Sequence, residues 1–171
     1  MNKNIVTENG IVLGRHLDGT LITRHYKGGR MPRSHASLGK VDFRTAMERS
    51  SNIYFSLLAS EVISHPAELQ KTTKTFGFGK RTGIDLYGEI GGYVPDDLRD
   101  NKTGLYSFAI GQHSLVVTPL QTAGMLAAIG NGGVVLKPQI VKLTANASGV
   151  SKVQRQVKQV VEMPVKVRTE L

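Results

Sequence analysis

The sequence DFRTAMERSSNIYFSLLAS, residues 42–60, contains two apolar stripes separated by the polar triplet Ser50-Ser51-Asn52. The apolar residues on each side of the triplet recur at the spacing of one helical face: Phe43, Ala46 and Met47, then Ile53, Tyr54, Leu57 and Leu58. Serine and asparagine prefer to hydrogen-bond nearby backbone rather than continue a helix, and Asp42 is placed to cap the first helix. The stretch therefore predicts two helices joined at a polar corner, from which Ser50 and Asn52 project.

The segments around this corner mix further helices with short strands. A hairpin is expected over residues 10–26 with Asp18-Gly19 at its turn, and residues 27–40 read as a loop. A helix is expected from Pro66 to just before Gly77, and glycines then predict an irregular segment up to Pro95. Thr118-Pro119 predicts the start of the best-defined helix, which Asn131-Gly132-Gly133 ends. Strand-like runs follow, and residues 150–171 suit an edge strand or an extended tail.

Composition limits the kind of protein and the kinds of site. The 171 residues are 40% hydrophobic and 20% charged, which is typical of one soluble globular domain. The absence of cysteine excludes disulfides, thiolate zinc sites and a cysteine nucleophile. The five histidines (16, 25, 35, 65 and 113) show no metal-ligand spacing, so we expect neither a metal nor a cofactor. No apolar run resembles a membrane span or a signal peptide, so the sequence as given carries no export or anchoring device.

The net charge of +9 is distributed unevenly. Residues 1–41 carry seven basic and two acidic residues, residues 150–171 carry five and two, and the interval between them carries ten and nine. A nucleic-acid interface more often places its basic residues on a folded element with interleaved aromatics, and aromatics make up only 6% of this chain. We therefore expect no nucleic-acid partner; the basic ends are either solvated or face an anionic surface.

Three blocks of sequence, taken in their order along the chain, are more informative than composition. The first is RTAMERSSNIYF at residues 44–55, which contains an S-x-N triplet. The second combines FGFG at 76–79 and TGIDL at 82–86 with Glu89 and Pro95. The third combines AIGQ at 109–112, VTPLQ at 117–121 and AAIGNGG at 127–133. In this order the blocks resemble the transpeptidase domain of class B, monofunctional penicillin-binding proteins. Together they cover about residues 35–142, with His113 in place of the glycine that usually follows Gly-Gln in that family.

The resemblance implies a fold as well as a family. We expect a mixed α/β, mainly helical structure that forms the central piece of the serine transpeptidase and β-lactamase-like fold, with an incomplete sheet. Residues 1–171 would then be one partial transpeptidase domain, with a hairpin at 10–26, a helical core region at 42–133 and a strand-like C-terminal segment at 134–171.

The family has three catalytic motifs: S-x-x-K with the acylated serine, S-x-N, and K-T-G on an edge strand. The lysine of S-x-x-K activates the serine for attack on an amide. By resemblance, Ser50 helps to relay a proton to the leaving amine, while Asn52 holds that lysine and a substrate amide. Ser50 and Asn52 are therefore the predicted catalytic and substrate-binding residues.

Two other motif spellings occur at the wrong places. Ser37-Leu38-Gly39-Lys40 spells S-x-x-K but begins only 13 residues before Ser50, whereas the family nucleophile lies much further upstream. Lys102-Thr103-Gly104 spells K-T-G, but it precedes the Gly-Gln and Thr-Pro-Leu-Gln block instead of following it, in what reads as a polar loop. Both are interpreted as coincidences.

The sequence thus predicts a fragment of a peptidoglycan D,D-transpeptidase that carries S-x-N but lacks the S-x-x-K nucleophile and the K-T-G strand, and is inactive alone. For the parent family, the resemblance implies peptidoglycan stem peptides and β-lactams as ligands, and an inner-membrane anchor with a periplasmic domain. A partner chain could supply the missing motifs. Two alternatives stay open: a compact acyl-serine enzyme that uses Ser37 and Lys40 with Ser50, Asn52 and Lys102, or a non-catalytic basic binding or scaffold protein.

Overall fold

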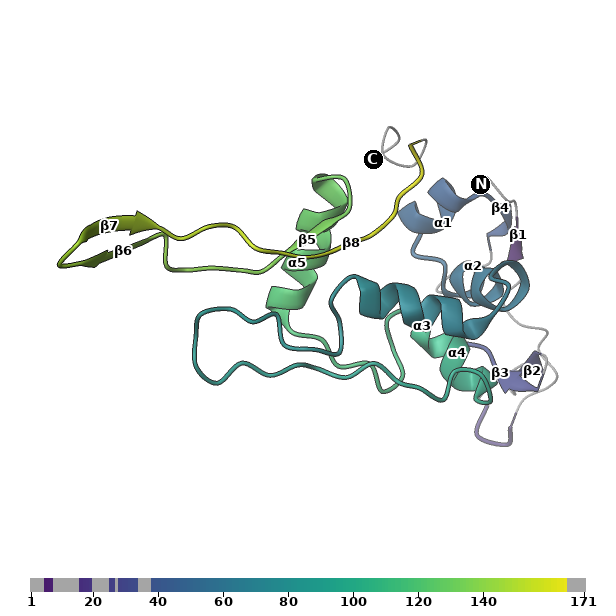
Figure 1. Ribbon diagram of the computed structural model, residues 1–171. Coiled ribbons are helices and arrows are strands. Elements are labelled where there is room, and N and C mark those ends of the chain that lie inside the picture. Colours follow the sequence, from purple (N-terminus) through teal and green to yellow (C-terminus); the bar gives the residue numbers. More distant parts are fainter. Residues whose placement is uncertain (1–4, 8–15, 20–24, 27, 34–37, 166–171) are drawn as a thin grey trace. The chain divides into compact units, whose positions relative to one another are not determined.

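The computed structural model describes residues 5–7, 16–19, 25–26, 28–33 and 38–165. Within these ranges the chain forms five α-helices, one π-helical turn and eight short strands arranged as two-stranded sheets (Figure 1). The predicted mixed α/β fold class with an incomplete sheet is confirmed. The chain divides into two compact units, the first comprising Met1–Gln70 with Pro95–Leu115 and the second comprising Lys71–Val94 with Val116–Leu171.

The first unit contains the predicted helical corner. Strand β1 (Ile5–Thr7) pairs antiparallel with β4 (Gly39–Val41), and β2 (His25–Tyr26) pairs with β3 (Gly29–Arg30). Helices α1 (Phe43–Glu48) and α2 (Asn52–Leu57) follow, and α2 continues into the π-helical turn η1 (Leu58–Val62). Helix α3 (Pro66–Thr75) begins in this unit, and α4 (Lys102–Phe108) completes it.

Two small apolar clusters hold the first unit together. Met31, Ile53 and Tyr106 pack with Leu57, and Val41, Ala46 and Tyr54 pack with Leu38, Phe55 and Leu58. Between α2 and α4, the buried Ser56 hydroxyl donates to the Tyr106 carbonyl oxygen at 3.2 Å. The first turn of α4 also lies close to Gly29, where a Cβ atom would overlap Lys102 and Tyr106. Helix α2 is therefore fixed to α4, and both pack against the segment that contains Gly29 and Met31.

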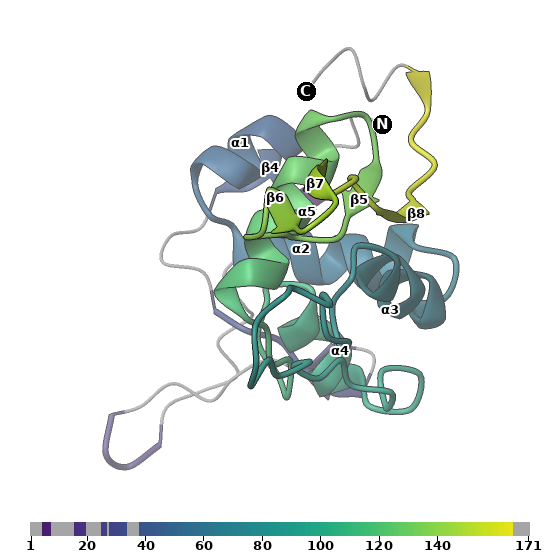
Figure 2. The same ribbon diagram turned by 60° about the vertical axis from the view of Figure 1, so that its left-hand side comes forward.

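The second unit is built on helix α5 (Pro119–Gly130), which packs beside β5 (Val134–Leu136) (Figure 2). Strand β5 pairs antiparallel with β8 (Val157–Val160), with a register shift after Val135. Ala128, Val135, Val161 and Met163 form the buried cluster, against which Phe76 packs. Strands β6 (Leu143–Asn146) and β7 (Gly149–Lys152) form a separate hairpin.

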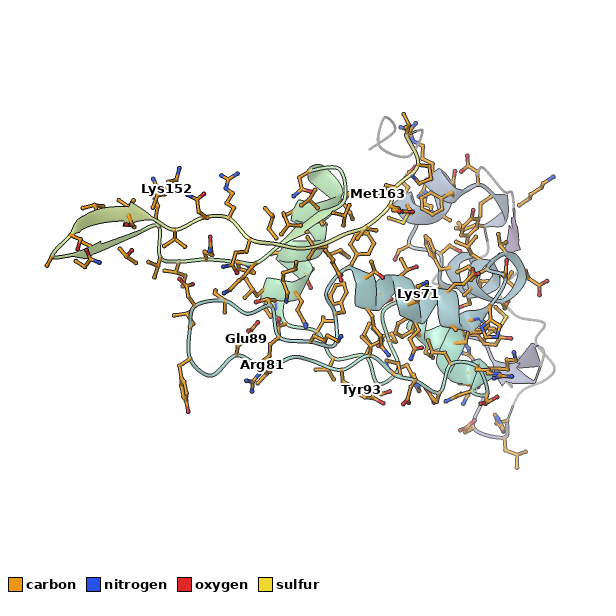
Figure 3. The ribbon with its side chains drawn as sticks, viewed as in Figure 1. Lys71, Arg81, Glu89, Tyr93, Lys152 and Met163 are labelled. Atoms are coloured by element: carbon orange, nitrogen blue, oxygen red, sulfur yellow. The ribbon has the colours of Figure 1, made fainter. Side chains whose placement is uncertain are left out.

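Gln121 organises the irregular part of the second unit. Its side chain is buried, and its amide nitrogen donates to the carbonyl oxygens of Lys80 at 2.9 Å and Gly91 at 2.7 Å. Its amide oxygen accepts from the Thr118 backbone N–H at 2.9 Å. One side chain thus closes the start of α5 and holds two separate parts of the turn-rich segment, which includes Arg81, Glu89 and Tyr93 (Figure 3).

The helix ends that depend on local chemistry follow the sequence prediction. Asp42 caps α1 by accepting from the Thr45 N–H at 2.8 Å, and Thr118 caps α5 in a reciprocal capping box with Gln121. Helix α3 begins at Pro66 and ends at Thr75, and Gly77 has φ +95°. Residues 76–95 are irregular apart from an isolated bridge between Tyr93 and Val116.

Other expectations were wrong or fall outside the described residues. Residues 27–40 are not one loop, because β3 and the start of β4 lie there and pair with other strands. The segment around Lys102 is a helix instead of a polar loop, because the Asn101 side chain accepts from the Gly104 N–H and caps α4. Of the hairpin over 10–26, most residues lie outside the described ranges, although a turn with Gly19 at φ +82° is present at 16–19. The assignment of 1–171 to one partial domain stays a prediction.

Candidate functional site

The corner between α1 and α2 begins with a left-handed residue at Ser50. The Ser51 N–H donates to the Ala46 carbonyl at 2.9 Å, and the Ser50 N–H donates to the Met47 carbonyl at 3.1 Å. These two bonds form the Schellman turn that commonly ends helices, usually with glycine in the left-handed position. Here Ser50 occupies that position with φ +50°, and its side chain is exposed. The sequence of the corner therefore keeps a hydroxyl where the backbone alone would favour glycine.

Because Ser50 has the conformation that favours glycine, Ser50→Gly should stabilise the chain. We expect its free energy of unfolding to rise by about 0.5–1 kcal/mol, and Ser50→Ala to leave it within about 0.5 kcal/mol. Both variants lose the hydroxyl, so the comparison isolates the backbone. Urea denaturation followed by circular dichroism gives the values, and a glycine variant no more stable than the alanine variant would show that the backbone at Ser50 is unstrained.

Ser51 and Asn52 are held by hydrogen bonds at the start of α2. The buried Ser51 hydroxyl accepts from the Tyr54 N–H at 3.3 Å and so caps the helix. The half-buried Asn52 side chain donates from Nδ2 to the Arg33 carbonyl oxygen at 2.7 Å. This bond fixes the plane of the Asn52 amide, so Ser51 shapes the corner while Ser50 and Asn52 present polar groups from it.

An aromatic cluster supports the corner. The Phe43 ring meets Tyr54 and Phe55 edge-on at centroid distances of 6.3 and 5.9 Å, and Tyr54 meets Phe55 at 5.4 Å. Burial, and then the charge of Asp42, raise the pKa of Tyr54, so its hydroxyl stays neutral. The pKa of Asp42 is lowered by the hydrogen bonds from the Thr45 backbone and side chain. The carboxylate that caps α1 is therefore ionised at neutral pH.

The lysine of the S-x-x-K spelling lies on a strand, and not on a helix as the catalytic motif would require. Lys40 lies exposed in strand β4, opposite Val6 of β1. Ser37 lies outside the described residues. A serine and a lysine three residues apart share one face when the backbone is helical, and a strand does not provide that arrangement.

The K-T-G spelling forms the first turn of a helix, whereas the family motif lies on an edge strand. Lys102 is exposed, and the Thr103 hydroxyl accepts from the Arg30 backbone N–H at 3.0 Å. The Gly104 N–H is used by the Asn101 cap at 2.7 Å. The Thr103 bond attaches α4 to β3 and the Gly104 bond caps α4, so both have structural roles.

His113 retains the turn that glycine usually makes after Gly-Gln. Its φ of +72° lies in the left-handed region, where histidine is tolerated better than most residues. Its Nε2 lies 2.9 Å from Asp97 Oδ1, and the other Asp97 oxygen accepts from Asn101 Nδ2 at 2.7 Å. The bonds from His113 and then from Asn101 lower the pKa of Asp97. Sequence reasoning missed this cluster, and the departure from glycine at 113 was its only signal.

The structure offers no evident metal centre or membrane helix within the residues that it describes. No group of three or more histidine or acidic side chains there could hold a metal ion. In the same part of the chain, no helix is both long and apolar enough to cross a bilayer.

Comparison with known proteins identifies the family. The model of the penicillin binding protein transpeptidase domain matches residues 16–169. The chain belongs to the penicillin-binding protein transpeptidase family. The match extends beyond residues 35–142, the range covered by the sequence blocks, at both ends. The predicted relationship to class B penicillin-binding proteins is confirmed.

Curated relatives in this family are much longer than the chain. It is 36% identical to penicillin-binding protein 2A of Bacillus subtilis over 127 residues, which are 66% of this chain and 17% of that protein. It is 30% identical to the peptidoglycan D,D-transpeptidase FtsI of Escherichia coli over 152 residues, 87% of this chain and 24% of FtsI. The chain therefore spans between about a sixth and a quarter of the length of these relatives.

A solved structure agrees with the family assignment. The crystal structure of penicillin binding protein 3 from Mycobacterium tuberculosis, complexed with aztreonam, matches with a TM-score of 0.65 and 25% identity. The match covers 94% of this chain and 32% of that one. Within this penicillin-binding protein fold, the structure brings Ser50 and Asn52 together at one helix corner. Lys40 lies on a strand, whereas an S-x-x-K motif needs a helix. Lys102–Gly104 lies on a helix, whereas the K-T-G motif of the family lies on a strand.

Proposed function

We propose that this chain is the part of a peptidoglycan D,D-transpeptidase domain that carries the S-x-N motif, with Ser50 as the proton relay and Asn52 as the positioning residue. The observation that carries the proposal is the α1–α2 corner. There the hydroxyl of Ser50 is exposed on a left-handed turn, and the amide of Asn52 is fixed by the Arg33 carbonyl. Supporting this, the S-x-N triplet lies in the expected order among the other family blocks, and the chain belongs to the family.

The chemistry assigned to the corner is acyl transfer. In the proposed parent reaction, an activated serine attacks the D-Ala-D-Ala amide of a stem peptide, and the acyl group then passes to an amine of another stem. The leaving amine needs a proton. A serine hydroxyl can accept one hydrogen bond while it donates another, so Ser50 suits a relay between an acid and that amine. The mycobacterial relative complexed with aztreonam supports β-lactams as ligands of the same parent site.

We infer that these 171 residues do not form an acyl-enzyme by themselves. Lys40 and Lys102 are the lysines of the two motif spellings, and they lie on a strand and on the first turn of a helix. The acylated serine and the K-T-G strand would then be supplied from outside this sequence, either by further residues of a longer protein or by a partner chain. Removing the nucleophile from a serine enzyme removes its covalent route.

Labelling with a fluorescent penicillin tests this inference. The purified chain and its Ser37→Ala variant are incubated with the label beside penicillin-binding protein 2A of Bacillus subtilis as the positive control. We expect covalent label on the control and none on the chain above the level of a heat-denatured sample. A label on the chain that disappears in Ser37→Ala would establish instead the compact enzyme that uses Ser37 and Lys40.

A further inference from the structure

Residues 137–158, here called the basic arm, form an extended part of the second unit. Strands β6 and β7 lie at the far end of two extended segments, one leaving β5 and the other returning to β8 (Figure 1). The hairpin pairs Leu143 with Lys152 and Ala145 with Val150. Lys152 lies at the base of the hairpin (Figure 3). The arm contains five lysine or arginine residues and no aspartate or glutamate.

The hairpin has one apolar face that is open to solvent. Its register places Leu143, Ala145, Val150 and Lys152 on one face, and Thr144, Asn146 and Ser151 on the other. Leu143 is 54% exposed and Val150 is 71% exposed. An isolated two-stranded hairpin is marginally stable in water, and an exposed apolar face gains stability when a partner covers it.

The base of the arm is hollowed. An open hollow of about 900 Å³ lies between residues 139–142 and 152–155. Its lining combines three apolar residues, three cations and two glutamines: Ile140, Val141 and Val153, then Lys142, Lys152 and Arg155, then Gln139 and Gln154. Within the described part of the chain, none of these three cations forms an ion pair. A ligand for this hollow would therefore combine an apolar side chain with carboxylates.

Among the residues that the structure describes, neither Asp85 nor Glu89 forms an ion pair with Lys142, Lys152 or Arg155, so these three cations stay available to a ligand. The Asp85 carboxylate accepts from the backbone N–H groups of Ile140 and Val141 at 2.7 and 2.8 Å, and these bonds lower its pKa. The Glu89 carboxylate accepts from the backbone N–H groups of Thr82 and Gly83. Burial works against ionisation of Glu89, but the hydrogen bond from the Thr82 hydroxyl, the two backbone bonds and the charge of Lys158 outweigh it and lower its pKa.

Hydrogen bonds from Lys158 and to Asp85 fix the arm to the irregular segment at residues 76–95. Lys158 Nζ donates to the carbonyl oxygens of Arg81 and Thr82 at 2.9 and 3.0 Å, and Asp85 holds the opposite side of the arm through Ile140 and Val141. Across the base, Gln139 Nε2 donates to the Gln154 carbonyl at 3.1 Å. Both extended segments are thus held at the base of the arm, where the cations and apolar side chains of the hollow lie together.

We propose that the basic arm docks an extended acidic segment of a partner protein, with an apolar side chain of that segment in the hollow and its carboxylates paired with Lys142, Lys152 and Arg155. The charge of the arm favours an acidic partner, and its apolar face and hollow favour a protein over a nucleic acid or a simple polyanion. The proposal goes beyond the proposed function and does not rest on it.

The test uses a fluorescein-labelled decapeptide of alternating glutamate and valine, with binding to the full chain followed by fluorescence anisotropy. We expect saturable binding that weakens as salt is added. Reversing three charges in Lys142→Glu, Lys152→Glu and Arg155→Glu should weaken it at least about tenfold. The control reverses three exposed charges outside the arm, Lys71→Glu, Lys74→Glu and Arg99→Glu, and should change it less than about twofold.

A second pair of measurements tests the apolar part. Ile140 is 60% exposed, so Ile140→Ser should leave the fold intact by circular dichroism while weakening the peptide at least about threefold. Polyglutamate of equal charge should bind at least about tenfold more weakly than the peptide. Absence of saturable peptide binding, equal binding of polyglutamate, or equal losses in the arm and control charge reversals would each overturn the proposal.

Discussion

Replacing Gln121 by glutamate should destabilise the second unit by about 4 kcal/mol at pH 8, because a buried carboxylate would then face carbonyl oxygens. In the native chain the amide nitrogen donates to the carbonyls of Lys80 at 2.9 Å and Gly91 at 2.7 Å. Gln121→Glu removes this donor and places negative charge against both acceptors. Urea denaturation, with hydrogen exchange of the amides in β5 and β8, measures the loss in this unit.

The pH dependence of that variant provides its internal check. The carbonyl oxygens favour the protonated carboxyl, so its pKa in the folded state lies above that in the unfolded state. The variant should therefore lose further stability as pH rises above the unfolded value, and the loss should be smaller at pH 5 than at pH 8. Gln112→Glu, at an exposed position, is the matched control. Similar losses in the two variants would contradict the role assigned to Gln121.

Gly133→Ala should destabilise the same unit by about 4 kcal/mol, because the new methyl group would meet backbone. Gly133 has φ +102°, and a Cβ atom there would overlap the Val161 carbonyl oxygen. The Gly133 carbonyl in turn accepts from the Val161 N–H at 2.8 Å. The strain would therefore fall between the end of α5 and the start of β5, where Gly133 lies against Val161, the residue after β8. The amides of β5 and β8 should then lose protection from hydrogen exchange.

Gly124→Ala is the control for this prediction. Gly124 lies inside α5 with no positive φ, and a Cβ atom there would have no neighbour within 4 Å. Alanine should stabilise the helix by about 0.5–1 kcal/mol, because it restricts the unfolded chain and suits the helical backbone. A Gly133→Ala variant as stable as Gly124→Ala would show that β5 and β8 can separate at Gly133 without loss.

Features that depend on neighbouring residues could be predicted from the sequence. Asp42 and Thr118 cap helices through backbone groups three residues away, and Pro66 marks a helix start for equally local reasons. The corner at Ser50–Asn52 was predictable for the same reason, because its polar triplet interrupts two apolar stripes. Its left-handed serine was not, because that conformation normally selects glycine.

Features that depend on distant residues could not be predicted. Strand β4 forms because residues 39–41 pair with residues 5–7, and Gly39 and Lys40 alone suggest a loop. The role of Gln121 depends on carbonyl groups 30 and 41 residues away. The π-helical turn at Leu58–Val62, with the sequence LASEV, likewise has no local signal that distinguishes it from an α-helix.

At the candidate site, too, the sequence predicts some features and only the structure gives the others. Order and spacing of the sequence blocks predict that Ser50 and Asn52 are the S-x-N residues, and the structure adds the exposed left-handed turn and the bond to Arg33. Spacing also favours the interpretation that the S-x-x-K and K-T-G spellings are coincidences. The structure adds a physical reason, because Lys40 pairs in a strand and Thr103 receives a hydrogen bond from Arg30.

The role of Ser50 is tested most directly in a complete enzyme that contains this corner. Residues 42–62 replace the corresponding segment of penicillin-binding protein 2A of Bacillus subtilis, and the rate of labelling by fluorescent penicillin is measured. The chimera should be labelled, and Ser50→Ala in it should slow acylation at least about a hundredfold, while Ser60→Ala changes the rate less than about twofold. A Ser50→Ala chimera labelled as fast as its parent would contradict the assignment of Ser50 as the relay.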